Sequence, residues 1–411
     1  MGLNRKRRKK TGKLLAVLLA FVPLVTGCWD RLELEERAVI LGVAVDRAEP
    51  DNGESEDDVT HMPGSFPAPE QHKIRVTVQI ALPGKIPLGP GEGGGGGGKP
   101  SETLWVIGVT GHTIDDAMMN LQQQISSLLF FGHLRAIVVS EEVAREGITN
   151  LNDFLRRNPE VRRMAWMMIS QGKAEQVIRT HPPLERVPTM YLISTLDNAV
   201  RMGKFPQSFM GNFWSNSSKL GQEGLLPYVK MMSEQNMELA GLAAFRGDTM
   251  VGASEPLEIA AYMAIKHINP GGYRGVIQLQ GTTVTIYATH RSSKIRVYLQ
   301  DGEPRFSVKV STEINVEEKT NELVSLSNDQ ILNKLEELGA VSTEKLYLEF
   351  IHKTQRWGSD IFGFGEYVRA KKSNYWNKNV KTMEKWQMMY NTVPIDVDVD
   401  FKIRRVGMKA K

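Results

Sequence analysis

The periodicity of apolar and polar positions changes several times along the chain, and each periodicity predicts a helix or a strand. Residues 38–46 form a short apolar run rich in β-branched side chains, which predicts a strand buried on both faces. In residues 74–82, apolar side chains alternate with Arg75, Thr77 and Gln79, which predicts a half-buried strand. The first part of the chain is therefore expected to begin with strands.

Helices and strands then alternate up to residue 202. Thr113 and Asp116 resemble a capping box, and apolar side chains follow them at helical spacing. Further strands are expected at 103–107, 134–139 and 164–169, with helices at 141–145, 149–157, 174–179 and 188–202. This order predicts an N-terminal α/β domain over residues 28–202. Residues 203–236 are rich in Gly, Ser and Asn and are interpreted as a connector or small lobe.

A strand-rich pattern begins at residue 237. Strands are expected at 239–245, 249–251, 276–279, 282–288, 294–300, 306–316 and 394–405, and helices at 255–267, 328–356 and around 375–390. Asp301-Gly302 lies between two of these strands and predicts a hairpin. Strands grouped before helices predict an α+β C-terminal domain over residues 237–407. The expected fold class is therefore α/β plus α+β, a multidomain protein with mixed sheets.

The first 27 residues have the pattern of a secretion signal. A basic run at 5–10 precedes an apolar segment at 14–25, which is shorter than the roughly 20 residues that a membrane-spanning helix needs. Val25, Thr26 and Gly27 follow, and the two small residues leave room for a peptidase before Cys28. The pattern predicts a lipobox, with residues 1–27 removed as a signal peptide.

Cys28 is the single cysteine of the chain and stands at the predicted cleavage point. Its thiol is the expected attachment site of a covalent diacylglycerol, with an N-acyl lipid on the new amino terminus, and no other cofactor is expected. Two acyl chains hold a membrane more firmly than one, since each buried methylene contributes about 0.8 kcal/mol. The protein would then be tethered to the outer face of a bacterial cell membrane. An ordinary buried cysteine beside an uncleaved anchor is the alternative.

Removal of the leader changes the charge of the protein. Seven of the 51 basic side chains lie before Cys28, so the mature chain has 44 basic against 47 acidic side chains and a formal charge of −3 in place of +4. The basic balance of the whole chain belongs to the leader, and no nucleic-acid partner is expected. With Cys28 lipidated, no intrachain disulfide can form, so stability must come from burial and hydrogen bonding.

Patterns that could bind a ligand are weak. The glycine run at 89–98 imitates a P-loop, but Pro100 stands where a hydroxyl should contact magnesium, so a flexible loop between strands is favoured. Asp396, Asp398 and Asp400 could be calcium ligands, but their alternate spacing on a strand favours a solvated strand face. The eight histidines show no pair at metal-ligand spacing, so no metal site is expected. No catalytic residue is expected either, because the sequence shows no nucleophile elbow.

Several short pieces of the sequence, in their order and spacing, resemble one known family. They are Cys28-Trp29-Asp30-Arg31 with Leu41-Gly42-Val43; Phe131-Gly132-His133-Leu134; Asn158-Pro159-Glu160-Val161-Arg162; Pro183-Leu184-Glu185; Asp360-Ile361-Phe362-Gly363-Phe364-Gly365-Glu366-Tyr367; Tyr375-Trp376; Trp386; and Ile403-Arg404-Arg405-Val406-Gly407. Together they span almost the whole mature chain, and the C-terminal pieces are the most specific. On these pieces the chain resembles the Ger(x)C family, the C-subunit lipoproteins of spore germinant receptors.

The resemblance implies a non-enzymatic subunit of a three-part receptor. Such a subunit acts beside two integral membrane subunits in the spore inner membrane and helps to convert a nutrient signal into germination. Whether it contacts the nutrient is left open. The alternative is an extracytoplasmic solute-binding lipoprotein of an uptake system, which usually has two similar α/β lobes, whereas the two halves here differ in pattern.

Phe362-Gly363-Phe364-Gly365 belongs to the most specific piece and allows two interpretations. It could be a loop that docks on a partner, with the aromatic rings as anchors and the glycines allowing close approach of the backbone. It could also be a tight turn that packs two phenylalanines into the core. The turn is favoured, because a glycine needed for positive φ gives the same sequence.

Overall fold

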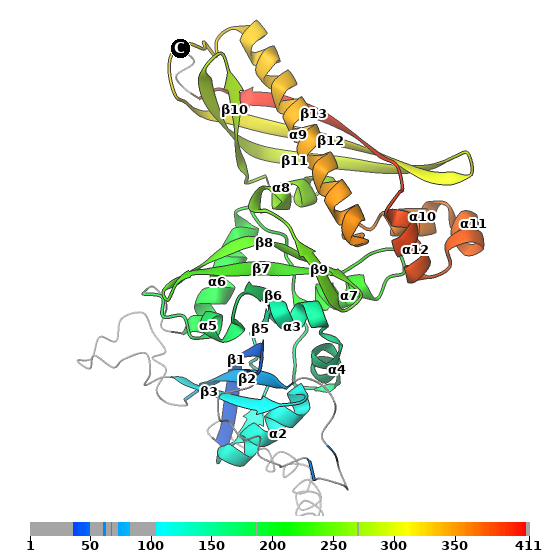
Figure 1. Cartoon of the computed structure of the whole chain (residues 1–411). Helices are drawn as coiled ribbons and strands as arrows, with labels where there is room; N and C mark the ends of the chain where they lie inside the picture. The colour runs from blue at the N-terminus through cyan, green and yellow to red at the C-terminus, as the bar shows by residue number, and fades with distance from the viewer. Residues whose placement is uncertain are drawn as a thin grey trace, which may run out of the picture.

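Two sheets, one above the other, form the body of an elongated molecule (Figure 1). The computed structural model describes residues 36–49, 61, 62, 67, 73–82, 104–183, 185, 187–268 and 271–407. The predicted signal peptide, the glycine run at 89–98 and the lipobox with its cysteine (Val25, Thr26, Gly27 and Cys28) lie outside these residues. Among the described residues, no helix combines the length and the apolar character needed to cross a membrane.

The first sheet is mixed, with the strand order β3-β2-β1-β5-β6-β7-β8-β9 and a short β4 paired with β1. Its strands are β1 (Arg37–Arg47), β2 (Ile74–Ala81), β3 (Leu104–Gly111), β4 (Leu128–Phe130), β5 (Ala136–Ser140), β6 (Trp166–Gln171), β7 (Leu225–Ser233), β8 (Asn236–Arg246) and β9 (Thr249–Ala253). The central strands from β1 to β7 run parallel, and antiparallel pairs extend the sheet at both ends. A parallel centre of this kind needs cover on both faces.

Helices supply this cover. The helices α2 (Ile114–Gln124), α3 (Glu141–Glu146), α4 (Thr149–Arg157) and α7 (Met210–Ser217) share one buried cluster with the strands. The helices α5 (Ala174–Ile178), α6 (Pro188–Arg201) and α8 (Pro256–Ile265) share the buried cluster on the other face. β1 is accordingly buried along almost its whole length, as its apolar run predicts. The N-terminal part therefore has the expected α/β architecture.

β2 is also buried on both faces, so the prediction of a half-buried strand is wrong. Thr77 and Gln79, which alternation places toward solvent, are fully buried. The Gln79 amide donates to the carbonyl of Ile178 at 3.3 Å, and its oxygen accepts a hydrogen bond from the Thr189 hydroxyl. These contacts reach α5 and α6, so the polar side of the strand is satisfied beneath a layer of helices.

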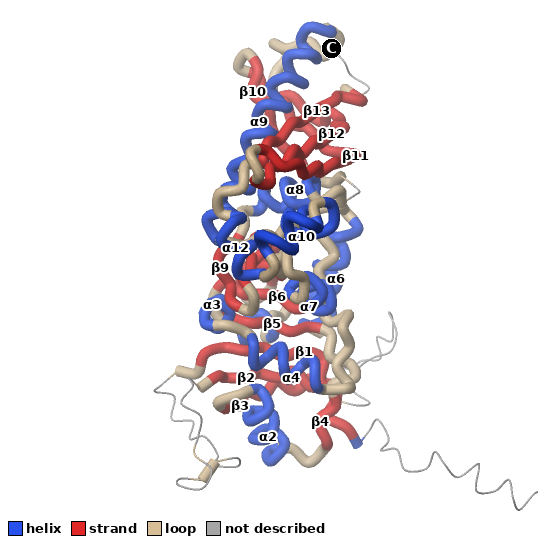
Figure 2. Tube along the Cα trace, turned by 90° about the vertical axis from the view of Figure 1, so that its right-hand side faces the viewer, coloured by secondary structure: helices blue, strands red, loops and turns tan. Residues whose placement is uncertain are grey.

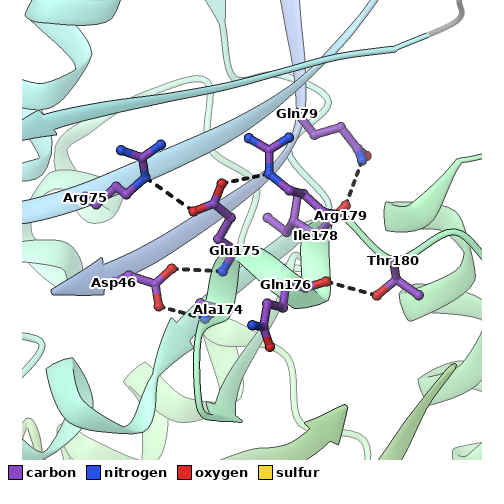
Figure 3. Close-up of polar contacts among 9 residues, drawn as sticks. All are labelled: Asp46, Arg75, Gln79, Ala174, Glu175, Gln176, Ile178, Arg179 and Thr180. Atoms are coloured by element: carbon purple, nitrogen blue, oxygen red, sulfur yellow. Dashed lines mark hydrogen bonds and ion pairs between the residues drawn. The ribbon is translucent and has the colours of Figure 1, made fainter. Parts of the chain in front are cut away.

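A polar cluster fastens α5 to the same sheet (Figure 3). The Asp46 carboxylate, at the end of β1, accepts hydrogen bonds from the backbone N–H groups of Ala174 at 2.7 Å and Glu175 at 2.8 Å. Burial raises the pKa of Asp46, and these two donors partly offset the effect. The Glu175 carboxylate in turn pairs with Arg75 of β2 at 3.3 Å and with Arg179 at 2.7 Å. The first turn of α5 is therefore held by both neighbouring strands.

The second sheet is built around a long hairpin. It contains β10 (Arg274–Leu279), β11 (Thr282–Gln300), β12 (Glu303–Lys319) and β13 (Ile395–Arg405), in that order. Asp301 and Gly302 form the turn between β11 and β12 with φ of 53° and 83°, as the hairpin signal predicts. The strands expected separately at 282–288 and 294–300 are one strand, because register shifts near residue 288 bend β11 without ending it.

One long helix and one short helix join the two sheets into a continuous core. α9 (Asp329–Trp357) crosses one face of the second sheet, and α8 lies between the sheets in both views (Figure 1 and Figure 2). α8 packs against β8 of the first sheet, β11 and β12 of the second, and α9. A single cluster of buried apolar side chains accordingly runs from the first sheet through α8 to the second sheet.

Short helices follow α9 before the last strand. They are α10 (Phe364–Lys371), α11 (Ser373–Tyr375), a π-helical turn η4 (Trp376–Val380) and α12 (Met383–Tyr390). The single helix expected around 375–390 is interrupted at Lys381, whose φ is 67°. α10 has no counterpart among the predicted elements, because Gly363 occupies its cap position in place of a polar side chain and a second glycine lies in its first turn.

Charged side chains line the exposed face of β13. Asp396 pairs with Arg305 at 2.9 Å and Asp398 with Lys309 at 2.8 Å, in both cases across to β12. Between these carboxylates, the side chain of Val397 is buried. Each of the two carboxylates thus has a cationic partner on the neighbouring strand, which is the arrangement of a solvated strand face.

The first sheet continues beyond the expected end of the N-terminal domain. Residues 203–236 contain α7 and β7, and β7 is hydrogen-bonded to both β6 and β8, so this segment belongs to the sheet and is not a separate connector. Its Gly, Ser and Asn residues lie largely in α7 itself and in the turns around it, whereas the apolar residues 225–229 are a buried strand. The expected boundary between residues 236 and 237 falls at the β7–β8 hairpin.

Candidate functional site at the junction of the two sheets

The two sheets meet around the turn between α9 and α10, residues 358–363. α9 ends at Gly358, with φ of 65°, and α10 begins after Gly363, with φ of 76°. Both residues are in the left-handed conformation that favours glycine. Within the turn, the Ser359 hydroxyl donates to the backbone carbonyl of Phe245 at 2.6 Å, which ties the turn to β8.

Asp360 organises this turn from within. Its side chain is 1% exposed, and its carboxylate accepts hydrogen bonds from the N–H groups of Gly363 at 2.7 Å, Gly365 at 2.8 Å and the Trp386 indole at 2.9 Å. Its backbone carbonyl accepts from the N–H of Glu223 at 2.9 Å. Burial raises the pKa of Asp360 to about 6, and the donors partly offset this effect. One residue therefore positions α10, α12 and the segment that leads into β7.

Two glycines allow the backbones on either side of the junction to touch. A Cβ atom on Gly221 would lie 2.4 Å from the carbonyl carbon of Gly365, and a Cβ atom on Gly365 would lie 2.6 Å from the Cα of Gly221. The N–H of Glu366 donates to the Gly221 carbonyl at 3.1 Å, and the N–H of Gly221 donates to the Glu366 carboxylate at 3.0 Å. A side chain at either glycine would force these two segments apart.

Phe362, in the turn, and Phe364, the first residue of α10, are both fully buried. Phe362 packs against Tyr262 of α8 and Phe350 of α9, with ring centroids 5.8 and 5.6 Å apart. Phe364 packs against Phe306 of β12 at 4.8 Å. The two rings thus belong to the core that joins the helices to the second sheet, which is the arrangement expected of a structural turn.

A second buried carboxyl group faces the same turn from the first sheet. Glu223 is 2% exposed and accepts hydrogen bonds from the N–H of Gly247 at 2.9 Å and from the side-chain amide of Gln387 at 2.5 Å. Burial raises the pKa of Glu223 to about 7; the two donors lower it, and the nearby Asp360 raises it further. The ionised form of this group is therefore costly at the junction.

Lys266, at the end of α8, brings a positive charge to the junction. Its ammonium donates to the backbone carbonyl of Phe362 at 2.8 Å. Burial lowers the pKa of Lys266, while the carboxylate of Asp360 raises it. Because two acidic groups are buried and Lys266 is half-buried, the charge state of the junction is coupled to how tightly its two sides pack.

We expect the junction to lose stability as the pH rises from about 4.5 to about 7. Because the pKa of Glu223 is higher in the folded chain than its ordinary value of 4.5, the folded state binds the proton more tightly, and this contribution is lost as the pH rises through about 7. Thermal unfolding of the wild type and of Glu223→Gln should show the variant gaining about 2–3 kcal/mol relative to the wild type between pH 4 and pH 8.

Glu238→Gln provides the matched control for this titration, because Glu238 is an exposed residue of the neighbouring strand β8. The difference in the free energy of unfolding between Glu238→Gln and the wild type should stay constant over the same pH range. A constant difference for Glu223→Gln as well would contradict the proposed cost of ionising Glu223.

Two other pieces of the resemblance meet at the opposite end of the first sheet. The Glu160 carboxylate accepts a hydrogen bond from the N–H of Phe131 at 2.8 Å, and the Asn158 side chain accepts one from the N–H of Glu160 at 2.9 Å. Phe131 and Glu160 line a cavity of about 640 Å³ between α2 and α4. This cavity is a second place where a ligand could be held, far from the junction.

The structure brings the residues expected at 362–365 together with others that the sequence did not indicate. Cys28 and the lipobox lie outside the described residues, so their roles stay predictions. Gly221 and Glu223 were missed, because their part in the junction depends on contacts with a segment far along the chain. One indication of Asp360 was present in the sequence, since it is the first residue of the family-like piece 360–367 that also contains Phe362 and Phe364.

Two family models of spore germination proteins match this chain, one in its N-terminal part and one in its C-terminal part. A model described as the spore germination protein N-terminal domain matches residues 30–231, and one described as spore germination B3/GerAC-like, C-terminal, matches residues 240–407. The division between the two matches falls at the β7–β8 hairpin. The junction at residues 358–366 therefore lies in the C-terminal match, whereas Gly221 and Glu223 lie in the N-terminal one.

Curated relatives and a solved structure cover most of the chain. The putative spore germination protein YfkR of Bacillus subtilis is 24% identical and the alignment covers 98% of this chain and 99% of the relative. Spore germination protein KC of Bacillus subtilis is 24% identical, with 96% of each chain covered. The crystal structure of the GerBC protein superposes with a TM-score of 0.55 at 20% identity, covering 81% of this chain and 94% of that one, which supports the fold. The chain belongs to the Ger(x)C family of spore germination proteins.

Proposed function

We propose that this protein is the lipid-anchored, non-enzymatic subunit of a nutrient-germinant receptor and acts with two integral membrane subunits in the spore inner membrane. The observation that carries the proposal is the pair of family matches over residues 30–231 and 240–407, together with relatives named as spore germination proteins over almost their full lengths. A role in spore germination follows from the family. The partners, the anchor and the non-enzymatic role are the proposed part.

The architecture supports a module that holds partners in a defined arrangement. A nine-stranded sheet covered by helices on both faces is joined through α8 to a four-stranded sheet with α9 across it. The two halves are unlike each other, whereas a solute-binding lipoprotein usually closes two similar lobes around its ligand. A continuous core between the sheets would instead transmit a displacement at one end of the molecule to the other.

The predicted anchor would keep the first sheet close to the bilayer. Cys28 lies nine residues before Arg37, where β1 begins, and nine residues of fully extended chain span at most about 30 Å. β1 is a central strand of the first sheet. In the proposed receptor, the lipid would therefore restrict both the distance and the orientation of the first sheet relative to the membrane subunits.

Spores that carry Cys28→Ala test the anchor and the receptor role together. Because the thiol accepts the lipid, we expect the chain to be lost from the inner-membrane fraction and nutrient-triggered germination to fall at least tenfold in rate. The matched control is Asp30→Asn, which changes a neighbouring residue and keeps the thiol. Germination by a non-nutrient trigger should stay normal in both strains.

A second measurement separates the parts of the proposal. Affinity purification of the wild-type chain from solubilised spore membranes should recover two multi-span membrane proteins in constant proportion. If Cys28→Ala releases the chain from the membrane and nutrient germination stays normal, the receptor role is contradicted. If the chain stays in place through its partners, the anchor alone is dispensable.

A further inference from the structure

Two histidines and an aspartate that are distant in the sequence meet beside α2. His112 follows β3, Asp116 lies in the first turn of α2, and His61 belongs to the connection between β1 and β2. His61 Nε2 lies 3.3 Å from Asp116 Oδ2, and His112 Nδ1 lies 3.7 Å from the same oxygen. One side-chain ligand atom from each of the three residues lies within 4.8 Å of the others.

The three side chains are largely buried, and hydrogen bonds to the backbone hold Asp116 and His112 together. The side chains of His61, His112 and Asp116 are 13%, 7% and 6% exposed. The Thr113 hydroxyl accepts a hydrogen bond from the N–H of Asp116 at 3.1 Å, and the Asp116 carboxylate accepts one from the N–H of His112 at 2.8 Å. The start of α2 therefore positions two of the three residues, and His61 reaches the cluster from a separate segment of the chain.

The two distances between the imidazole nitrogens and the Asp116 carboxylate agree with the spacing of ligand atoms around a metal ion. A tetrahedral ion with ligands at about 2.1 Å holds neighbouring ligand atoms about 3.4 Å apart, close to the two spacings above. A carboxylate has about four lone-pair positions, so its hydrogen bond to the N–H of His112 leaves room for an ion. The helix cap explains Asp116 but gives no reason for two imidazoles to converge on it from different elements.

The surroundings leave a place for a further ligand. His112 and Thr113 line a cavity of about 410 Å³ that also reaches Glu146. Three protein ligands with one position open to a cavity are typical of zinc sites that retain a water molecule or exchange a ligand. Two nitrogen ligands and one oxygen ligand select a borderline divalent ion over calcium or magnesium, which prefer oxygen alone.

We propose that His61, His112 and Asp116 bind a divalent transition-metal ion of the zinc class. The ion would join His61, between β1 and β2 in the sequence, to the end of β3 and the start of α2. The proposal is independent of the receptor role, since it depends on these three side chains alone.

Equilibrium dialysis of the full chain in detergent against ZnCl₂, after treatment with a chelator, tests the site. We expect one equivalent of zinc to bind, and His61→Ala to weaken this binding at least tenfold. His61→Ala is the decisive variant, because His61 lies outside the helices and strands and its removal leaves α2 capped. Asp116→Asn keeps a cap acceptor and should also weaken binding, provided that circular dichroism shows an intact fold.

His352→Ala is the matched control, because His352 is exposed on α9 and remote from the cluster. It should leave the bound equivalent unchanged. Zinc should also slow proteolysis within residues 48–73 of the wild type and have no such effect on His61→Ala. Less than one equivalent bound by the wild type, or undiminished binding by His61→Ala, would overturn the proposal.

Discussion

Replacing Asp360 by alanine is expected to lower the free energy of unfolding by about 3–5 kcal/mol. The substitution removes the shared acceptor of three buried donors, the N–H groups of Gly363 and Gly365 and the indole of Trp386. Each donor would then be desolvated without a partner, which costs about 1–3 kcal/mol. Denaturant unfolding at pH 7, followed by tryptophan fluorescence, measures the loss, because Trp386 lies at the site of the change.

Asp396→Ala serves as the control for this experiment. Asp396 is also an aspartate of the C-terminal part, but its side chain is 53% exposed and its pairing with Arg305 lies on the surface. The expected cost is below about 1 kcal/mol. If Asp360→Ala were no more destabilising than Asp396→Ala, the organising role of Asp360 in the turn would be refuted.

Gly365→Val is expected to separate the two sides of the junction, at a cost of about 3 kcal/mol or more. The new Cβ would lie 2.5 Å from Trp386 Nε1 and 2.6 Å from the Cα of Gly221, so backbone has to move. In the wild type, the N–H groups of Gly221 and Glu366 donate hydrogen bonds across the junction. Amide hydrogen exchange at these two groups should therefore be faster in Gly365→Val.

The same substitution at Gly275 controls for the effect of valine itself. Gly275 lies in β10, and a Cβ there would meet only the Ile286 side chain, at 3.7 Å. Valine is a good strand former, so Gly275→Val should be neutral or slightly stabilising. Equal effects of the two substitutions would show that contact between the backbones does not restrict residue 365.

Local patterns predicted most elements of this fold, because their physical causes lie within a few residues. Asp301-Gly302 is one example, since the conformation of the turn is decided by two residues that tolerate positive φ. The buried run of β1 is another, because a strand in the centre of a covered sheet is apolar on both faces. The fold class could therefore be predicted correctly.

The parts that escaped prediction depend on contacts between distant segments. Gln79 looks like a solvent-facing residue until Thr189 and Ile178 supply its hydrogen bonds. The high pKa of Glu223 has no local signal, because it comes from burial by elements that pack around the junction. His61 and His112 show no metal spacing along the chain, and only the fold places them side by side.

The β7–β8 hairpin decides how this protein can be divided. Most of β8 and all of β9 belong to the match of the C-terminal region but complete the sheet of the N-terminal one. A chimaera of two family members that is joined at residues 232–239 would pair a β7 from one parent with a β8 from the other. Joining the parents after Ala253 keeps the sheet from a single parent and transfers α8 with the second sheet. A folded chimaera of two family members is therefore best joined at that point, with residues 360–366 additionally changed to those of the parent that supplies residues 221–223.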